Sequence, residues 1–552
     1  MRRSSEASLA LSHSEDEHEP AMADAKAIRL FLLTMVMFCH LFTFTLLLPV
    51  EPQYVADIMG GDEPLKSASF FLGWITACRS ALEFLSNPIF GSLSDCYGRR
   101  PFILLALSGT VLENVLKGLF PNEGVIAGAT ISTGSVAMCI TVCLAYIADT
   151  DPRNVSKNFG LVGVALGFAF VSGPVIGGTL GVENIKAVYF IAAGVELVGI
   201  AIVLVVLTES LAPEKRAEFT LSRINPLSVF HVLLRTRFIL YMASVMFFLL
   251  LAQNLNVVWS LYTKYKFDWS STELGIFLGV VGLVAVLSNG ILLRIMVTKL
   301  PPPDPVLSDE RALSEEEVEA HAYEVERRQR QRDFHSCAVA ILCSIFALFF
   351  FGLATHSWML YVILVFAAVG ITADPAMRGL LSKHTPPKEQ GELQGAISGM
   401  HTIARVIGPL LATSLFGWFI SDDMPVKVPG APFFLFSFTQ CIALGLLMFK
   451  VTVDGVADVD FETPPPAAVR KGIAGAGAAA GAEFGTEDEH TGLLATGGVE
   501  EDADAPKHLT NGTFADIPDL EPGAAVVVQG DEAGRAGDGA GHGDGQGPAE
   551  DG

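Results

Sequence analysis

The chain has 552 residues, of which 51% are hydrophobic and 17% are charged, with a mean hydropathy of +0.46 and a formal net charge of −23. Its apolar residues gather in runs of about 20, the length that spans a hydrocarbon core of about 30 Å, so an ordinary soluble protein is excluded. The acidic excess lies before residue 27 and after residue 451, and without a basic patch to neutralise phosphates no nucleic-acid partner is expected.

Twelve apolar segments follow one another along the chain, six on each side of a polar stretch. All should be helices, because lipid offers backbone groups no other hydrogen-bond partner. The predicted spans are 28–50, 67–90, 101–120, 124–148, 159–180, 187–208, 237–262, 272–297, 335–355, 358–381, 395–420 and 432–450. The predicted fold class is therefore an all-α polytopic membrane protein of twelve transmembrane helices in two six-helix halves.

These spans divide the chain into a series of parts. They are a leader (1–27), a first half (28–208), a linker (209–236), a second half (237–450) with an insert (298–334), and a tail (451–552). The leader and the acidic tail should be disordered cytosolic segments, because they have too few apolar residues to build a core. In the insert, Ser314 and Glu317 have the spacing of a capping box and predict a short helix.

The distribution of lysine and arginine predicts the orientation in the membrane. One set of alternate loops carries most of them, including Arg99, Arg100 and Lys383. The positive-inside rule places these loops and both termini in the cytosol.

The tail also holds a candidate sorting signal. Glu489, Leu493 and Leu494 fit an acidic dileucine pattern read by sorting adaptors, although so short a pattern also arises by chance. An endosomal, vacuolar or plasma membrane is the expected location.

The hairpin between the second and third spans, residues 91–101, is the most informative segment. Its charges Asp95, Arg99 and Arg100 cannot lie in lipid, so it should be a short water-facing connection. Gly91 and Gly98 would permit a close helix approach and a tight turn.

The charges of this hairpin have candidate partners. Asp95 suits a helix N-terminus across the bundle, and the guanidinium of Arg99 offers a fork to a carboxylate. Asp149, at the end of the fourth span, is the candidate carboxylate. The alternative is a solvated turn that only orients its two helices.

Ionisable residues inside the spans are functional candidates, because a charge at mid-bilayer costs roughly 2.5–3.5 kcal/mol on insertion scales. Arg79 with Glu83, and Glu113 with Lys117, have the i, i+4 spacing that allows pairing across a helical turn. The alternative for each is a neutralised structural ion pair.

Further candidates stand in later spans. Glu196 is isolated in the sixth span, and a carboxyl group in low dielectric, like that of Glu113, could carry a proton. His401 and Arg405 lie together in the eleventh span, and the histidine is a candidate for a substrate or gating role. Asp374 and Arg378 form another i, i+4 pair.

The seventh span is unusually polar at its middle. Gln253, Asn254, Asn256 and Trp259 could line a cavity that holds a polar or amphipathic solute. The alternative is hydrogen bonding between helices.

The fifth span contains Gly173, Pro174, Gly177 and Gly178. Small residues on one helix face allow close packing, and proline bends the axis. Structural packing and an antiport-specific role remain open.

Several segments of the chain resemble known family signatures. The hairpin resembles the G-x-L-x-D-x-x-G-R-[RK]-P motif of the major facilitator superfamily, in which these charges form a latch between the halves. The fifth-span element resembles the G-P-x-x-G-G element of drug:proton antiporters. Residues 83–95, 146–149 and 391–409 are similar to the tetracycline-resistance-like branch, and most to its hippocampus-abundant-transcript-like members.

This resemblance implies a transporter of a small organic solute that works by alternating access, with proton-coupled antiport as the favoured mode. Thr130 departs from the family, because many proton-coupled members carry an arginine there. A facilitator or symporter of sugars or similar polar metabolites remains an alternative. So does a non-transporting receptor or scaffold that acts through the insert and tail.

Other functions and partners are limited by what the sequence lacks. There is no nucleotide loop, metal-ligand spacing or nucleophile elbow, so we expect no enzyme, cofactor or metal site. The expected partners are the solute, protons, the lipid bilayer and sorting adaptors, with the protein acting as a monomer.

Overall fold

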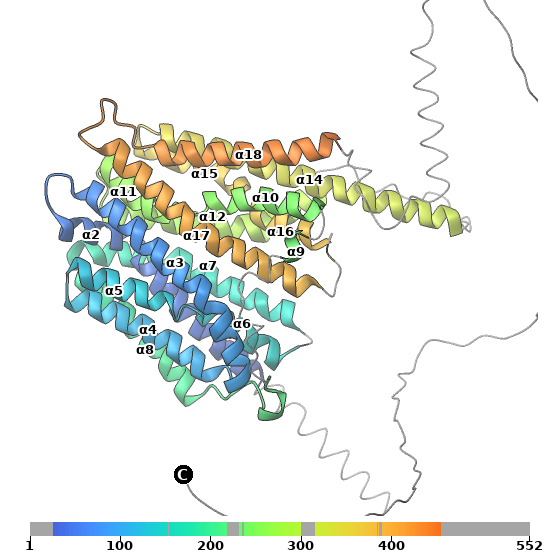
Figure 1. Cartoon of the computed structure of the whole chain (residues 1–552), viewed down its shortest axis with the longest axis horizontal. Coiled ribbons are helices and arrows are strands. Elements are labelled where there is room, and N and C mark those ends of the chain that lie inside the picture. The colour runs from blue at the N-terminus through green and yellow to red at the C-terminus, as the bar shows by residue number, and fades with distance from the viewer. Residues whose placement is uncertain are drawn as a thin grey trace, which may run out of the picture. The chain divides into compact units, whose positions relative to one another are not determined.

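The computed structural model describes residues 26–152, 154–217, 231–234, 237–299, 315–383, 385 and 389–453. These residues all belong to one compact unit, Met1–Ala480. Their regular secondary structure is helical (Figure 1). The sorting residues Glu489, Leu493 and Leu494 lie outside the described residues.

The first half begins with a helix over Lys26–Leu47. It continues with α2 (Glu51–Met59), α3 (Pro64–Tyr97), α4 (Arg100–Leu119), α5 (Glu123–Gly134), α6 (Cys139–Thr150), α7 (Val155–Glu183) and α8 (Ile185–Val205). Each predicted span coincides with a helix, but the fourth is broken into α5 and α6. The short helix α2 was not predicted.

The second half is built in the same way. Its elements are α9 (His231–Leu234), α10 (Arg237–Ala252), α11 (Asn256–Phe267), α12 (Ser271–Leu287), a π-helical turn (Ser288–Leu292), α13 (Leu293–Lys299), α14 (Glu315–Leu353), α15 (Ser357–Gly370), α16 (Ala373–Lys383), α17 (Gln390–Ile420) and α18 (Ala431–Val453). The short helix predicted in the insert is continuous with the ninth span, since α14 runs unbroken through both.

Helix breaks at membrane depth are stabilised by local contacts. Between α10 and α11, Asn254 Nδ2 donates to the carbonyl of Leu250 at 2.8 Å, which satisfies a group freed by the break. At the end of α5, Gly134 lies against the backbone of Arg79 in α3, with no room for a Cβ atom. The break therefore lies at a close helix contact.

Eleven described helical stretches are long and apolar enough to cross a membrane, and α3 makes the twelfth. Its 34 residues include Lys66, Arg79 and Glu83, which lower its hydropathy. It nevertheless packs along α17, itself one of the eleven.

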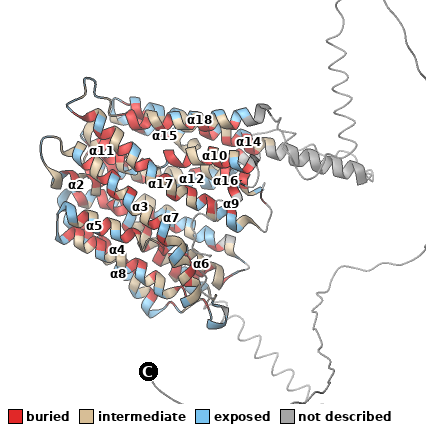
Figure 2. Ribbon diagram, viewed as in Figure 1, coloured by how far each residue is buried: buried red, intermediate tan, exposed pale blue. Residues whose placement is uncertain are grey.

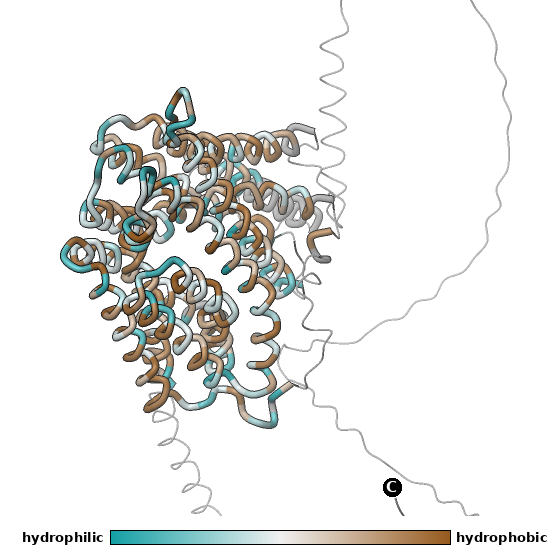
Figure 3. The backbone as a smooth tube through the Cα atoms, turned by 60° about the vertical axis from the view of Figure 1, so that its left-hand side comes forward, coloured by the Kyte–Doolittle hydropathy of each residue, from teal (hydrophilic) through white to brown (hydrophobic). Residues whose placement is uncertain are grey.

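The exposed surface of the helices is apolar, as a lipid-facing surface requires. Trp74, Phe168 and Val365 are each more than half exposed. Figure 3 shows hydrophobic residues along the lengths of the helices, while Figure 2 shows the buried residues between them. One buried cluster of the first half gathers Leu33 and Leu107 with residues of α6 and α8.

The most extensive contacts between the halves are those of α3 with α17 and of α7 with α12, while α11 makes smaller ones with α2 and α3. Small residues permit the two extensive contacts. Gly73 of α3 lies against Thr413, and Gly178 of α7 lies against the backbone of Ser271 in α12. We call these contacts the two seams.

The fifth-span glycines face two different helices, not one. Gly173 and Gly177 lie against Thr45 and Leu46 of the first span, whereas Gly178 faces α12 across a seam. The expectation of a single small-residue face was therefore wrong. One side of α7 packs within its own half, and the other side meets the second half.

The start of α4 is fixed by a residue from the linker. Both carboxylate oxygens of Glu209 accept backbone N–H groups, from Arg99 at 2.7 Å and Arg100 at 3.1 Å. A carboxylate is favourable there because these N–H groups have no partner within the helix. Gly98, with φ of 103°, makes the turn beside this carboxylate. At Gly91 no atom lies within 4 Å of the position that a Cβ atom would take, so its predicted role in close approach was wrong.

We predict that Gly98→Ala lowers the stability of the protein by about 1–3 kcal/mol, because an L-residue is strained at this φ. The added methyl group would also meet Glu209 Oε2 at 2.6 Å. Thermal unfolding of the purified protein measures the effect. Gly91→Ala is the matched control on the same hairpin, and an equal loss in both variants would contradict the explanation.

We predict that Gly178→Ala separates α7 from α12 and costs about 1–3 kcal/mol, as overpacking does. In a cysteine-free chain carrying Ser271→Cys, which replaces a buried serine, labelling by a water-soluble thiol reagent should become faster. Gly163→Ala is the control, since nothing lies within 4 Å of its Cβ position. Equal labelling rates in the two variants would show that the seam tolerates the methyl group.

Candidate functional site

The charges of the hairpin bond to one another within the first half. Arg99 Nε donates to Asp149 Oδ2 at 3.0 Å, and its Nη1 lies 2.5 Å from Asp95 Oδ1. The prediction that Asp149 pairs with Arg99 is confirmed. We call the end of the bundle that carries Asp95, Arg99 and Asp149 the motif end.

Asp95 differs from its predicted partner. Its carboxylate was expected to meet the N-terminus of a helix across the bundle, whereas it pairs with Arg99, four residues further along the chain. Its backbone carbonyl accepts from the amide of Ala217 at 3.1 Å. The hairpin and the start of the linker are thus joined by a backbone hydrogen bond.

Arg100 stabilises the end of α8. Its guanidinium donates to the carbonyls of Val203 at 3.1 Å and Leu204 at 2.7 Å. A cation is favourable at a helix C-terminus, where carbonyls lack helical partners. The Arg100 guanidinium therefore joins the start of α4 to the end of α8, and it is the backbone N–H of Arg100 that meets the Glu209 carboxylate.

A further ion pair lies at the motif end. Lys26 Nζ is 2.9 Å from Asp151 Oδ1. The hydrogen bond from Lys26 is the largest influence that lowers the pKa of Asp151 to about 2, assisted by Asn158 and Asn154. Asp151 is thus ionised at neutral pH and ties the start of the first span to the end of α6.

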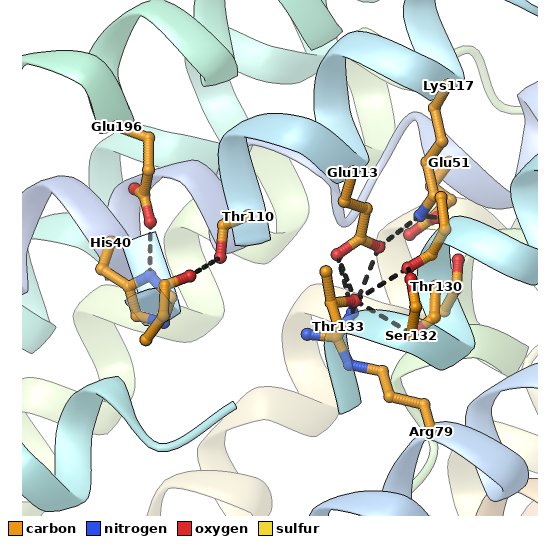
Figure 4. Close-up of polar contacts among 12 residues, drawn as sticks. His40, Glu51, Arg79, Thr110, Glu113, Lys117, Thr130, Ser132, Thr133 and Glu196 are labelled. Carbon is orange, nitrogen blue, oxygen red and sulfur yellow. Dashed lines mark hydrogen bonds and ion pairs between the residues drawn. The ribbon is translucent and has the colours of Figure 1, made fainter. Parts of the chain in front are cut away.

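A cluster of buried charges lies in the first half, around Glu113 (Figure 4). Arg79 Nη1 donates to both carboxylate oxygens of Glu113 at 3.1 Å. Lys117 Nζ donates to Glu113 at 2.7 Å and to Glu51 at 2.6 Å. Thr133 donates a further hydrogen bond at 2.7 Å. Both oxygens of Glu113 are therefore held by permanent cations.

These contacts confirm one predicted pair and correct another. Glu113 and Lys117 do pair at i, i+4. Arg79 bonds to Glu113 on α4 and not to Glu83 on its own helix. Thr130, where the family resemblance suggests an arginine, is buried one turn before Thr133.

Glu83 instead joins the two halves. Its Oε1 lies 2.5 Å from Nη2 of Arg405 on α17. Arg405 therefore reaches across the α3–α17 seam, whereas His401 on the same helix shows no hydrogen bond to the described residues. Asp374 and Arg378 pair within α16 at 2.9 Å, as predicted.

Glu196 is not isolated, contrary to the prediction. His40 Nδ1 of the first span lies 2.6 Å from Glu196 Oε1, and Figure 4 shows the two side chains pointing toward one another. Glu196 is fully buried, while the His40 side chain is 20% exposed. Sequence reasoning missed His40 because it searched for pairs along single helices.

The polar residues of the seventh span lie at the break between α10 and α11. Gln253 and Asn256 are exposed, and Asn254 is half-buried. Trp259 packs among aromatic rings of the second half, with the centroids of Phe351 and Phe433 each at 4.8 Å. The half-buried indole is thus packed against the core on one side, and its role at a cavity wall stays a prediction.

The described residues contain no group of three or more metal-ligating side chains. Many of the charged groups inside the described spans instead form ion pairs, both within and between helices. Such an arrangement can bind and release protons or compete with a charged solute.

Comparison with known proteins identifies the family to which this fold belongs. The profile of the Major Facilitator Superfamily matches residues 33–307 and 331–488. Tetracycline resistance protein, class C, of Escherichia coli is 26% identical over 379 residues, covering 67% of this chain and 85% of the relative. Hippocampus abundant transcript-like protein 1 of Homo sapiens is 24% identical over 394 residues, covering 67% and 71%.

A solved structure shares the fold. The crystal structure of the human organic anion transporter MFSD10 (TETRAN) matches with a TM-score of 0.54 at 20% identity, covering 76% of this chain and 99% of that one. The superfamily consists of transporters and not of enzymes. The chain therefore belongs to the Major Facilitator Superfamily, in the branch of the tetracycline resistance and hippocampus-abundant-transcript-like proteins.

Proposed function

We propose that this protein exchanges a small organic solute for protons across the membrane by alternating access. The observation that carries the proposal is the position of the contacts between the halves. Curated relatives named as tetracycline resistance proteins support a small organic molecule as the solute.

The polar contacts between the halves extend from the end opposite the motif to the middle of the bundle. At that end, Lys66 Nζ donates to Ser421 at 2.7 Å, and Glu63 accepts from the amide of Asp422 at 2.7 Å. Glu83 and Arg405 form the contact at mid-length. The hairpin charges at the motif end bond within the first half. This asymmetry supports a transporter in which one end is closed while the other can separate.

Alternating access requires that such contacts break and reform as one half rocks against the other. The seams suit this motion, because glycine and other small residues let the helices of the two halves approach closely without a bulky side chain on both sides of the contact. Asp95, Arg99, Arg100 and Asp149 would serve as gate charges that gain partners on the second half when the motif end closes. Gln253 and Asn256, exposed at a helix break, are candidates to contact the solute, and His401 is a further one.

We place the motif end in the cytosol, because the positive-inside rule assigns the Arg99 loop to that side. The described arrangement then corresponds to a protein closed toward the exterior. The acidic tail would be cytosolic, where its Glu489–Leu494 segment could meet sorting adaptors.

We predict that a chain whose only cysteine is Cys96, in the hairpin, is labelled by an impermeant thiol reagent only after cells are permeabilised. A chain whose only cysteine is Asp62→Cys, at the opposite end, should be labelled in intact cells. Sugar attached at Asn154, which stands in an Asn-Val-Ser sequon, would contradict this orientation.

We predict that the purified protein in liposomes accumulates tetracycline against its gradient when a pH gradient is imposed. One-for-one exchange can sustain about a tenfold concentration ratio for each pH unit. Uptake that is the same with and without the pH gradient would refute proton coupling. Lys427→Gln, which removes an exposed ion pair with Asp422, is a control expected to retain full uptake.

A further inference from the structure

The buried carboxylates of the described residues differ in the kind of partner they have. Four of them pair with arginine or lysine: Glu83 with Arg405, Glu113 with Arg79 and Lys117, Asp151 with Lys26, and Asp333 with Lys383. The fifth, Glu196, pairs with His40. Among the partners of these five carboxylates, only His40 has a side chain of a type that can lose its charge near neutral pH.

The contacts of Glu196 are also fewer than those of Glu113. Glu196 Oε1 lies 2.6 Å from His40 Nδ1, but the buried Oε2 has no hydrogen-bond partner among the described residues. Glu113 is held by two cations and a hydroxyl group. A buried carboxylate with one neutral partner is costly as an anion, so the pair gains much from a bound proton. Glu113 is fixed as an anion.

One member of the pair is partly exposed. Glu196 is the twelfth of the 21 residues of α8 and is fully buried, whereas the His40 side chain is 20% exposed. Of the two groups, His40 is therefore the one that an incoming proton can reach first. Without a bound proton, the pair consists of a neutral imidazole and a carboxylate and carries a net negative charge. One added proton makes the pair neutral.

Other titratable and charged groups lie near the pair. They are Cys39 on the first span, Cys139 and Cys143 from α6, and Arg79 from α3. Arg79 opposes a positive charge on His40. Since α3 also forms a seam, a movement of α3 between the halves would change the proton affinity of His40.

The first span also contacts the other seam. Thr45, five residues after His40, donates to the carbonyl of Ala169 on α7 at 2.8 Å. Leu46 packs against Gly177 of the same helix, whose other side carries Gly178 against α12. A shift of the first span is therefore in a position to reach the contact between the halves.

We propose that His40 and Glu196 form the site that binds and releases the coupling proton. The proposal rests on the proposed proton exchange and adds to it the residues that carry the proton. Neither residue takes part in the hairpin gate.

Proton uptake by the purified full-length protein tests the site without any solute. Between about pH 10 and about pH 7.5, above the range of an ordinary histidine because the Glu196 carboxylate favours the bound proton, His40→Gln and Glu196→Gln should each take up about one proton fewer than the wild type. An imidazole without its anion stays unprotonated over this range, and without the imidazole the group that binds the proton is gone. Asp333→Asn, which removes a buried carboxylate held by Lys383, should match the wild type.

Either variant taking up as many protons as the wild type would overturn the proposal. The two substitutions are independent, so a variant that fails to fold leaves the other to decide. Transport in liposomes distinguishes a proton-binding role of Glu196 from a merely structural one. Glu196→Gln should keep tetracycline–tetracycline exchange without a pH gradient but lose the roughly tenfold accumulation per pH unit.

The two proposals fail in different ways. A wild type that transports without any response to the pH gradient refutes proton exchange, while proton uptake still decides whether the pair binds a proton. A wild type that responds, together with a Glu196→Gln variant that accumulates tetracycline equally well, refutes the assignment of the pair alone.

Discussion

The structure depends on one constraint: a charge buried among membrane-spanning helices must find an opposite charge on a neighbouring helix. Arg79, Glu113 and Lys117 meet this requirement inside the first half. Glu83 and Arg405 meet it between the halves. Because insertion of an unpaired charge is costly, these pairs fix which helix faces meet. The same pairs are the places where a change of charge can alter the packing.

The two seams show how a tightly packed membrane protein can retain freedom to move. Gly178 and Ser271 let α7 and α12 approach to backbone contact without interlocking side chains. At the motif end, by contrast, Glu209 and Arg100 fasten helix ends to one another within the first half. At the motif end the polar bonds thus lie within the first half, while the polar bonds between the halves lie at mid-length and at the opposite end. This difference favours motion of the halves as units.

Sequence reasoning found the helices, the local pairs and one contact between helices, that of Arg99 with Asp149, but not the other contacts between helices. The length of the apolar runs indicated every span, and the i, i+4 spacing indicated Glu113 with Lys117. The partner of Arg79 could not be found in this way, because it depends on which faces of α3 and α4 meet. Glu209 was assigned to a linker, and nothing in its neighbourhood signals that it caps α4. His40 could have been found, since an ionisable residue within a span is itself a signal.

The long helix α14 has a consequence for the segment before the ninth span. Its 39 residues extend roughly 60 Å at 1.5 Å per residue, about twice the thickness of the hydrocarbon layer. Only Gln331–Leu353 is apolar enough to cross that layer. Nucleating a helix in water is unfavourable, whereas adding turns to an existing one is not. The membrane-embedded part thus supplies the nucleus from which the polar part propagates, so a proline placed near the boundary would uncouple the two and leave the outer turns to form unaided.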